Sequence, residues 1–179
     1  MKTIQKEITV YTYNELSDEA KEKALQNNYE SEYFWNDENR ATLNEFEKVM
    51  PVNVHNWSYG DRGEGVQFDV ADELENLMGV RLYKWIVNNI DAKYYNKDAK
   101  DGSCPLTGYG ADCNILKELV AFMQHPSDID AETLFGRCFD AWVTGCKEDM
   151  EDYYSEESFK EMCESNEWTF LESGEMYNV

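Results

Sequence analysis

Carboxylates are the side chains whose number and spacing could do chemistry in this sequence. The chain has 37 Asp and Glu residues against 16 Lys and Arg, a formal net charge of −21 on 179 residues. From Glu118 to Val179 there are 16 acidic and three basic residues, so this last third carries −13. Such an excess repels nucleic acid and anionic membranes and attracts basic protein surfaces. We therefore expect a basic nucleic-acid-binding protein as the partner, and no direct binding to nucleic acid or to a membrane.

Acidic residues near the C-terminus recur at helical spacing. Side chains four residues apart on a helix lie about 5–6 Å from each other, and phosphates of one DNA strand rise by about 3.4 Å each. Glu148, Asp152 and Glu156 would line one side if their helix continued. Such an array could occupy a nucleic-acid groove, although a solvated helix face is the simpler alternative. The predicted partner-binding residues are Glu148, Asp149, Asp152, Tyr153, Glu156, Glu157 and Glu161.

Aromatic residues interleave with acids in two places, before residue 36 and around residue 153. Tyr and Trp are enriched among the residues that dominate protein interfaces, so Tyr33 and Tyr153 are the interface candidates. Aromatic residues at helical spacing usually belong to a core, and three tryptophans are expected there: Trp35, Trp85 and Trp142.

Residue types typical of enzymes offer little geometry. There are two histidines: His55 falls in a predicted strand and His125 at a predicted helix end. The glycine-rich run 60–65 leads into a strand, whereas a phosphate cradle needs a helix N-terminus, so a hairpin turn is favoured. The run 98–102 lacks oxygen ligands at the first and third positions of a calcium loop. We expect no catalytic residue, no metal and no cofactor.

The five cysteines are expected to be reduced thiols. Their number is odd, no Cys-x-x-Cys pair occurs, and reduced, mostly buried thiols are usual in the cytosol. Cys104 and Cys113 lie nine residues apart without a second pair of ligands, so a zinc site is not expected.

Composition indicates a folded chain. Acidic chains that stay unfolded are poor in aromatic residues, whereas this one has 12 Tyr, 8 Phe and 5 Trp. Its length suits one domain, predicted to span residues 1–179. The N-terminus lacks the apolar stretch of a signal peptide, and no segment approaches the roughly 18 apolar residues of a membrane span. We expect a cytosolic globular protein.

Hydropathy patterning predicts an α+β fold with a small, mostly antiparallel sheet and about five helices. Ser17 and Ser155 are predicted N-caps, and Pro51 a helix stop. Strands are predicted at 3–13, 52–59, 65–70 and 168–171, the middle two as a hairpin. Helical patterns cover 18–29, 43–50, 71–90, 112–124, 130–154 and 155–166, with a long loop at 94–111.

Several segments of the chain carry a resemblance as an ordered set. They are YTYNELSDEAKEKA (11–24), CPLTGYGAD (104–112), YSEESF (154–159) and ESNEWTFLESGEMY (164–177). The set resembles a family of small acidic proteins of phages and bacterial mobile elements that carry the label "antitoxin of toxin–antitoxin stability system". That family overlaps anti-CRISPR proteins, which are often acidic and often occupy the DNA-binding surface of a CRISPR nuclease. The resemblance implies a location in the bacterial host cytoplasm and carries over no functional residue.

The resulting hypothesis is a phage- or mobile-element-encoded, non-enzymatic inhibitor of a host defence nuclease. A type II CRISPR effector loaded with guide RNA is the expected target, because it has a positively charged channel and a site that reads a short duplex. Stoichiometric binding there would block DNA binding or activation. Two alternatives stay open: an antitoxin-like neutraliser of a basic toxin, and a metal-dependent hydrolase that uses carboxylates such as Asp69, Asp72 and Glu73.

Overall fold

The computed structural model describes residues 7–29, 33, 35–60, 63–96 and 104–177. In this part of the chain six α-helices and one two-stranded antiparallel sheet form, which confirms the predicted α+β class. The fold divides into two compact units: unit 1 comprises 1–33 and 150–179, and unit 2 comprises 34–149. The expectation of one domain over 1–179 stays a prediction beside this division. No helix among the described residues is long and apolar enough to cross a membrane.

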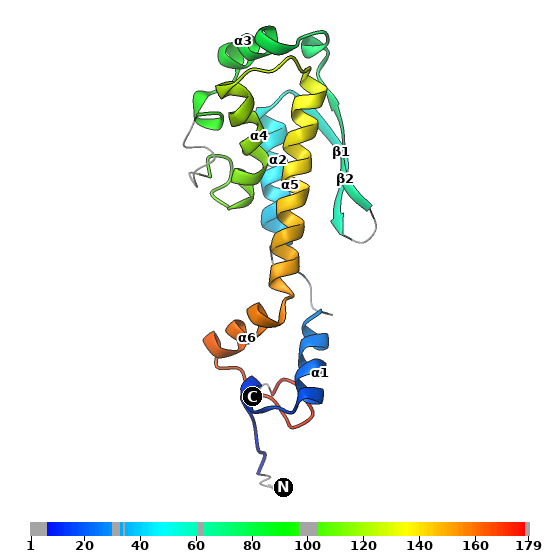
Figure 1. Ribbon diagram of the computed structural model, residues 1–179, viewed down its shortest axis with the longest axis vertical. Helices are drawn as coiled ribbons and strands as arrows, with labels where there is room; N and C mark the ends of the chain where they lie inside the picture. Colours follow the sequence, from blue (N-terminus) through cyan, green and yellow to red (C-terminus); the bar gives the residue numbers. More distant parts are fainter. Residues whose placement is uncertain (1–6, 30–32, 34, 61–62, 97–103, 178–179) are drawn as a thin grey trace, which may run out of the picture. The chain divides into compact units, whose positions relative to one another are not determined.

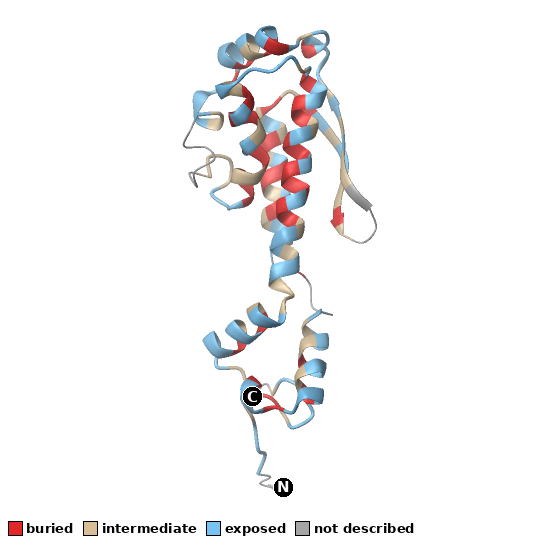
Figure 2. Cartoon of the chain, in the orientation of Figure 1, coloured by how far each residue is buried: buried red, intermediate tan, exposed pale blue. Residues whose placement is uncertain are grey.

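Unit 2 is organised around α5 (Ala131–Tyr153), most of which belongs to it. Helix α2 (Asn36–Val49) packs against α5 through Phe46, whose ring centroid lies 5.4 Å from that of Phe139. The hairpin packs against the same helix: Phe68 lies 4.6 Å from Phe139, and Trp57 lies 5.5 Å from Trp142. Helix α4 (Ala111–Gln124) lies beside α2 (Figure 1). Buried residues follow α5 through unit 2 (Figure 2).

The predicted hairpin and its preceding helix stop are confirmed. Helix α2 ends at Val49, and the N–H of Met50 donates its last helical hydrogen bond to the carbonyl of Phe46 (2.8 Å) just before Pro51. Proline disfavours the helical conformation of the residue before it, so the chain turns there into an extended strand. Strands β1 (Val52–Gly60) and β2 (Gly63–Val70) then pair antiparallel.

The helix predicted over 71–90 begins later than its apolar stripe suggests. A 3₁₀ turn, η2 (Asp72–Leu74), comes first, and the α-helix α3 runs over Gly79–Asn89. Between them the backbone of Asn76 is left-handed (φ 68°), and so is that of Gly79 (φ 55°), the first residue of α3. These residue types adopt that conformation most readily, and it cannot continue a right-handed helix. Leu74 and Leu82 are both buried, so the stripe continues across the break.

Unit 1 has a small aromatic core between α1 (Asp18–Tyr29) and α6 (Glu156–Ser165). The ring of Tyr13 packs edge-on against that of Phe159 at 5.3 Å. The buried cluster consists of Tyr13, Leu16, Ala20, Ala24, Phe159, Cys163 and Phe170. Both predicted N-caps are present, because Ser17 Oγ accepts from the N–H of Ala20 (3.3 Å) and Ser155 Oγ from that of Ser158 (3.1 Å).

The strands predicted at 3–13 and 168–171 are wrong for the described residues. Tyr11 and Phe170 exchange both backbone hydrogen bonds (2.8 Å each), and this forms a single bridge without a strand. On its other side Phe170 bridges to Met176. Ile8 and Val10 are 45% and 38% exposed, so the alternating apolar positions do not cover a core. The segment 1–6 lies outside the described residues.

Candidate functional site

The predicted partner-binding residues lie on two helices. Glu148 and Asp149 are on α5 within unit 2, whereas Asp152 and Tyr153 end α5 within unit 1. The remaining three acids, Glu156, Glu157 and Glu161, are on α6. All six acids are exposed, and Tyr153 is half-buried.

The single row of acids from Glu148 through Asp152 to Glu156 depended on one continuous helix, and that condition is not met. Helix α5 ends at Tyr153, and Ser155 is extended (φ −66°, ψ 152°) as the N-cap of α6. A helical row needs an unbroken helix, so the four-residue spacing holds only inside each helix, as for Glu157 and Glu161 on α6.

The acids of α6 differ in what they contact. Asp152, just before the helix, accepts a hydrogen bond from the hydroxyl of Ser158 (3.3 Å). Burial, together with the nearby Glu156 carboxylate, raises the pKa of Tyr13 to about 12. In the described part of the chain, Glu157 and Glu161 make no hydrogen bond or ion pair with protein groups. Among the predicted acids of α6, Glu157 and Glu161 are therefore the most available to a partner.

Charge is concentrated in unit 1. This unit is little more than a third of the chain, yet it has 16 acidic and 5 basic residues, a net of −11. The longer unit 2 has 21 acidic and 11 basic residues, a net of −10. One of the five bases of unit 1, Lys23, pairs with Glu175 (3.1 Å). Since five bases cannot neutralise sixteen acids, unit 1 keeps a large excess of negative charge.

An apolar pocket of about 270 Å³ lies within unit 1. Four of its nine lining residues are aromatic, and Phe159 is 6.3 Å from Trp168 and 6.4 Å from Phe170, measured between ring centroids. Tyr153, one of the predicted partner-binding residues, is part of its wall. The full lining is Ala24, Asn27, Asn28, Tyr153, Phe159, Trp168, Phe170, Gly174 and Met176.

The other aromatic assignments are partly corrected. Tyr33 is only 7% exposed and packs edge-on against Tyr153, with ring centroids 5.4 Å apart. Tyr33 is therefore too buried to contact a partner itself, and it packs against the interface candidate Tyr153. Trp142 is fully buried, as predicted, and Trp85 is half-buried. Trp35 is 47% exposed, and its placement in the core was wrong, because it precedes the first turn of α2 instead of lying on its buried face.

Sequence reasoning did not find Asp112, the most thoroughly hydrogen-bonded carboxylate of unit 2. This side chain is fully buried at the start of α4. Its Oδ2 accepts from the backbone N–H groups of Leu106 (2.8 Å), Thr107 (2.7 Å) and Gly108 (3.2 Å). Its Oδ1 accepts from the hydroxyls of Thr107 (2.7 Å) and Thr42 (2.9 Å). The segment CPLTGYGAD is thus a loop folded around its own last residue.

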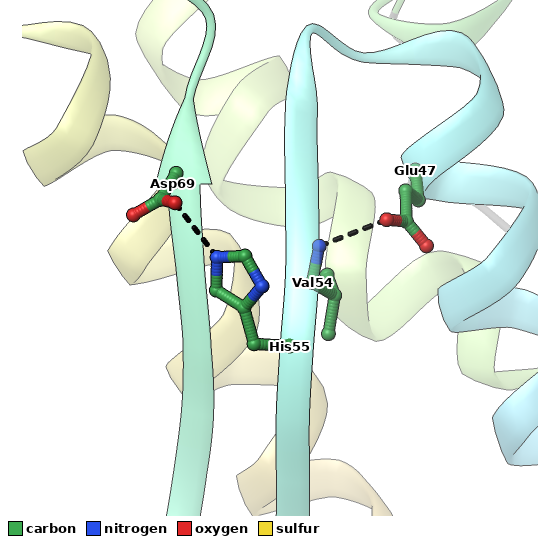
Figure 3. A network of polar contacts seen from close by, with 4 residues as sticks. All are labelled: Glu47, Val54, His55 and Asp69. Atoms are coloured by element: carbon green, nitrogen blue, oxygen red, sulfur yellow. Dashed lines mark hydrogen bonds and ion pairs between the residues drawn. The ribbon is translucent and has the colours of Figure 1, made fainter.

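The carboxylates of the hydrolase alternative lie in unit 2. Asp69 on β2 binds the Nε2 of His55 on β1 (2.7 Å), at a β-bulge where the N–H of Val54 donates to Glu47 (2.8 Å) (Figure 3). Asp69 and Asp72 line a pocket of about 510 Å³, which Asp130 and Glu132 also line but Glu73 does not.

Metal ligands do not cluster in the described residues. No group of three or more His, Cys, Asp or Glu side chains there is placed to hold a metal ion. The rejected calcium run 98–102 lies outside the described residues.

Comparisons with protein-family models, with curated proteins and with solved structures give no match to this chain.

Proposed function

We propose that this protein is a stoichiometric inhibitor that binds the nucleic-acid-binding surface of a basic protein through unit 1. The observation that supports this most is the net charge of −11 on unit 1, where acids outnumber bases by 16 to 5. Self-repulsion of this size costs folding stability, and an acidic face of this density attracts a Lys- and Arg-lined groove over a long range.

Glu157 and Glu161 are the centre of the proposed surface. They lie one helical turn apart on α6, they are exposed, and protein groups in the described chain leave their oxygens open. Asp152 and Tyr153 precede that helix in the same unit. A row of carboxylates on a pre-formed helix loses little conformational entropy on binding, so it can compete with the phosphates of a nucleic acid.

The apolar pocket gives the same surface a place for an anchor. Three acids are sequence neighbours of its lining: Asp152 beside Tyr153, Glu167 beside Trp168, and Glu175 beside Met176. Binding energy in interfaces comes mainly from a few side chains that fill desolvated pockets, and rim charges set the association rate. A basic segment with one apolar or aromatic side chain fits this combination.

The proposed partner is a guide-RNA-loaded type II CRISPR nuclease, and the proposed origin is a phage or mobile element. The resemblance of the four segments between residues 11 and 177 supports this choice. A decisive experiment titrates the protein into such a nuclease and measures cleavage of a duplex that carries its target and PAM. Stoichiometric loss of cleavage supports the proposal. Full cleavage at a large excess of the protein contradicts this partner and favours the alternative, an antitoxin-like neutraliser of a basic toxin.

The surface is tested with two variants of equal net charge. The first carries Asp152→Lys, Glu157→Lys and Glu161→Lys in unit 1, and the second carries Glu73→Lys, Glu132→Lys and Asp140→Lys in unit 2. All six residues are exposed, and Glu132 matches Glu157 in lying in the first turn of its helix. Both variants change the net charge by the same amount, so non-specific attraction weakens equally in both.

We expect the unit 1 variant to bind at least about tenfold more weakly, mainly through a slower association rate that no longer depends steeply on salt. The unit 2 variant should keep most of the affinity. Equal losses in the two variants would mean that only total charge matters. A loss confined to the unit 2 variant would place the partner on the other unit. Circular dichroism and thermal melting of both variants separate these results from unfolding.

A further inference from the structure

Two of the five cysteines lie in contact. The Sγ atoms of Cys104 and Cys113 are 3.9 Å apart, and both residues are half-buried. The other three cysteines are nearly or fully buried: Cys138, Cys146 and Cys163. All five are free thiols in the structure.

Hydrogen bonds near each cysteine hold the two sulfurs in contact. Cys113 follows Asp112 in the first turn of α4, and the Asp112 carboxylate binds the N–H groups of Leu106, Thr107 and Gly108. The N–H of Gly108 also donates to the carbonyl of Cys104 (3.0 Å). Both ends of the loop are thus fixed by hydrogen bonds that do not involve sulfur.

Cys104 itself has an uncommon conformation. Its backbone is left-handed (φ 42°) at a residue that is not glycine, which costs about 1–2 kcal/mol. The cysteine side chain itself does not favour a left-handed backbone. The conformation is consistent with a position fixed by the loop, directly before Pro105, with the sulfur directed to Cys113.

We propose that Cys104 and Cys113 are a reversible redox pair that closes the Asp112 loop with a disulfide when the protein meets a small disulfide oxidant such as oxidised glutathione. The thiolate of Cys113 attacks one sulfur of the oxidant and releases one glutathione thiolate. The Cys104 sulfur then loses its proton to solvent, attacks the Cys113 sulfur and releases the second glutathione thiolate. The two cysteines lose two electrons and two protons, and the oxidant becomes two glutathione thiols.

The order of attack and the choice of cysteines follow from the surroundings. Burial, followed by the neighbouring Cys113, raises the pKa of the Cys104 thiol to about 11, so Cys104 is a poor first nucleophile. Burial raises the pKa of Cys163 to about 11 and raises those of Cys138 and Cys146 still further. These three thiols are therefore protected both from access and from ionisation.

The experiment uses the full chain, incubated with oxidised or reduced glutathione and then alkylated after denaturation. Mass spectrometry should find a Cys104–Cys113 cross-linked peptide and three alkylated cysteines in the oxidised sample, and five alkylated cysteines in the reduced one. Closing this short loop should raise the melting temperature by roughly 5–10 °C. Reduction with dithiothreitol should reverse both changes.

The variant Cys104→Ser should form only a mixed disulfide between Cys113 and glutathione. The variant Cys113→Ser should form little mixed disulfide, because Cys104 is a poor first nucleophile, and neither variant should show such a gain in melting temperature. Five alkylated cysteines after oxidation, a disulfide that involves Cys138, Cys146 or Cys163, or a dimer linked between chains would each overturn the proposal. The peptide map of the wild-type chain decides the question even if a variant does not fold.

Discussion

Unit 1 and unit 2 carry almost the same net charge on very different amounts of protein. The shorter unit 1 has −11, with a core of seven buried residues around Tyr13 and Phe159. The longer unit 2 has −10, and in it helix α2 packs against α4, α5 and strand β1, while strand β2 packs against α5. A small core offsets repulsion less well, because the fraction of surface buried falls as a unit becomes smaller. Unit 1 therefore depends on a few close contacts.

The contacts that hold each unit differ in kind. In unit 1 the C-terminal segment turns at Gly174, whose backbone lies against α1, and bridges to Tyr11 through Phe170. In unit 2 the comparable role belongs to a side chain, since Asp112 organises the loop before α4. Substitutions at these positions test whether the two units are stabilised independently.

The largest expected effect is that of Gly174→Ala in unit 1. A Cβ there would lie 2.1 Å from the carbonyl oxygen of Ala20, and the backbone is left-handed (φ 82°), so clash and strain add. We expect the free energy of unfolding to fall by more than about 3 kcal/mol. Hydrogen exchange should accelerate in α1 and α6 while α4 keeps its protection.

The control for this substitution is Gly110→Ala in unit 2. A Cβ at Gly110 meets nothing within 4 Å, and its φ of −57° suits any residue, so its effect should stay within about 0.5 kcal/mol. If Gly174→Ala exposes α4 to exchange as fast as α1, the two units unfold together and the comparison between them fails.

Asp112→Asn should have the next largest effect, in unit 2. The carboxylate accepts five hydrogen bonds in a fully buried position, and an amide nitrogen in place of one oxygen would face donors. An unsatisfied buried group of this kind costs about 1–3 kcal/mol, and hydrogen bonds to a charged group are at the upper end. Urea unfolding should therefore show a loss of about 2–3 kcal/mol, against almost none for the exposed Asp140→Asn. A loss as small as that of the Asp140→Asn control would contradict the organising role of Asp112.

Local signals of the fold could be predicted from the sequence. Pro51, the alternation of the two hairpin strands, and the caps Ser17 and Ser155 act through the backbone of their immediate neighbours, so the sequence contains all that they need. Alternation at 3–13 misled because a strand needs a partner, and only Tyr11 has one in the described chain.

The candidate site could be predicted only in part, for a similar reason. Exposure of the acids follows from their charge, and α6 carries three of them as expected. The apolar pocket combines α1, the end of α5, α6 and the C-terminal segment, and no periodicity within one segment reveals it. Burial of Tyr33 against Tyr153 and the five donors to Asp112 are likewise tertiary contacts between residues far apart in the chain or in an irregular loop.

The next, smaller effect is the stabilisation by helix N-caps, which should depend on pH for the charged cap Asp130 in unit 2 but not for the neutral cap Ser155 in unit 1. The Asp130 carboxylate accepts from the N–H of Thr133 (2.8 Å) at the start of α5, and hydrogen bonds from the Thr133 side chain and backbone lower the pKa of Asp130. Folding lowers this pKa, so the stabilisation is complete above the unfolded value of about 3.9 and is lost as pH falls through the lower folded value.

Asp130→Ala should therefore cost about 1 kcal/mol at pH 7, and the difference from the wild type should shrink below about pH 4. Ser155→Ala in unit 1 should cost a similar amount at every pH, because its hydroxyl does not titrate. Thermal melting of both variants from pH 7 to pH 3 measures the two differences. Parallel pH profiles would show that the Asp130 charge contributes nothing.

The smallest expected effect is a gain, from Glu167→Gly at the end of α6 in unit 1. Glu167 is left-handed (φ 54°), and the N–H of Trp168 reaches back to the carbonyl of Cys163 (2.9 Å), a helix ending that usually has glycine at this position. Relief of the left-handed strain should stabilise unit 1 by about 0.5–1 kcal/mol after the greater entropy of glycine in the unfolded chain is subtracted. Removal of one acid from the more charged unit adds to that gain.

Glu167→Asn and Glu167→Gln distinguish the two causes, because both remove the charge but only Asn tolerates the left-handed conformation. We expect Gly and Asn to raise the melting temperature more than Gln does. If Gln raises it as much as Gly, repulsion among the carboxylates of unit 1 limits its stability and backbone strain does not.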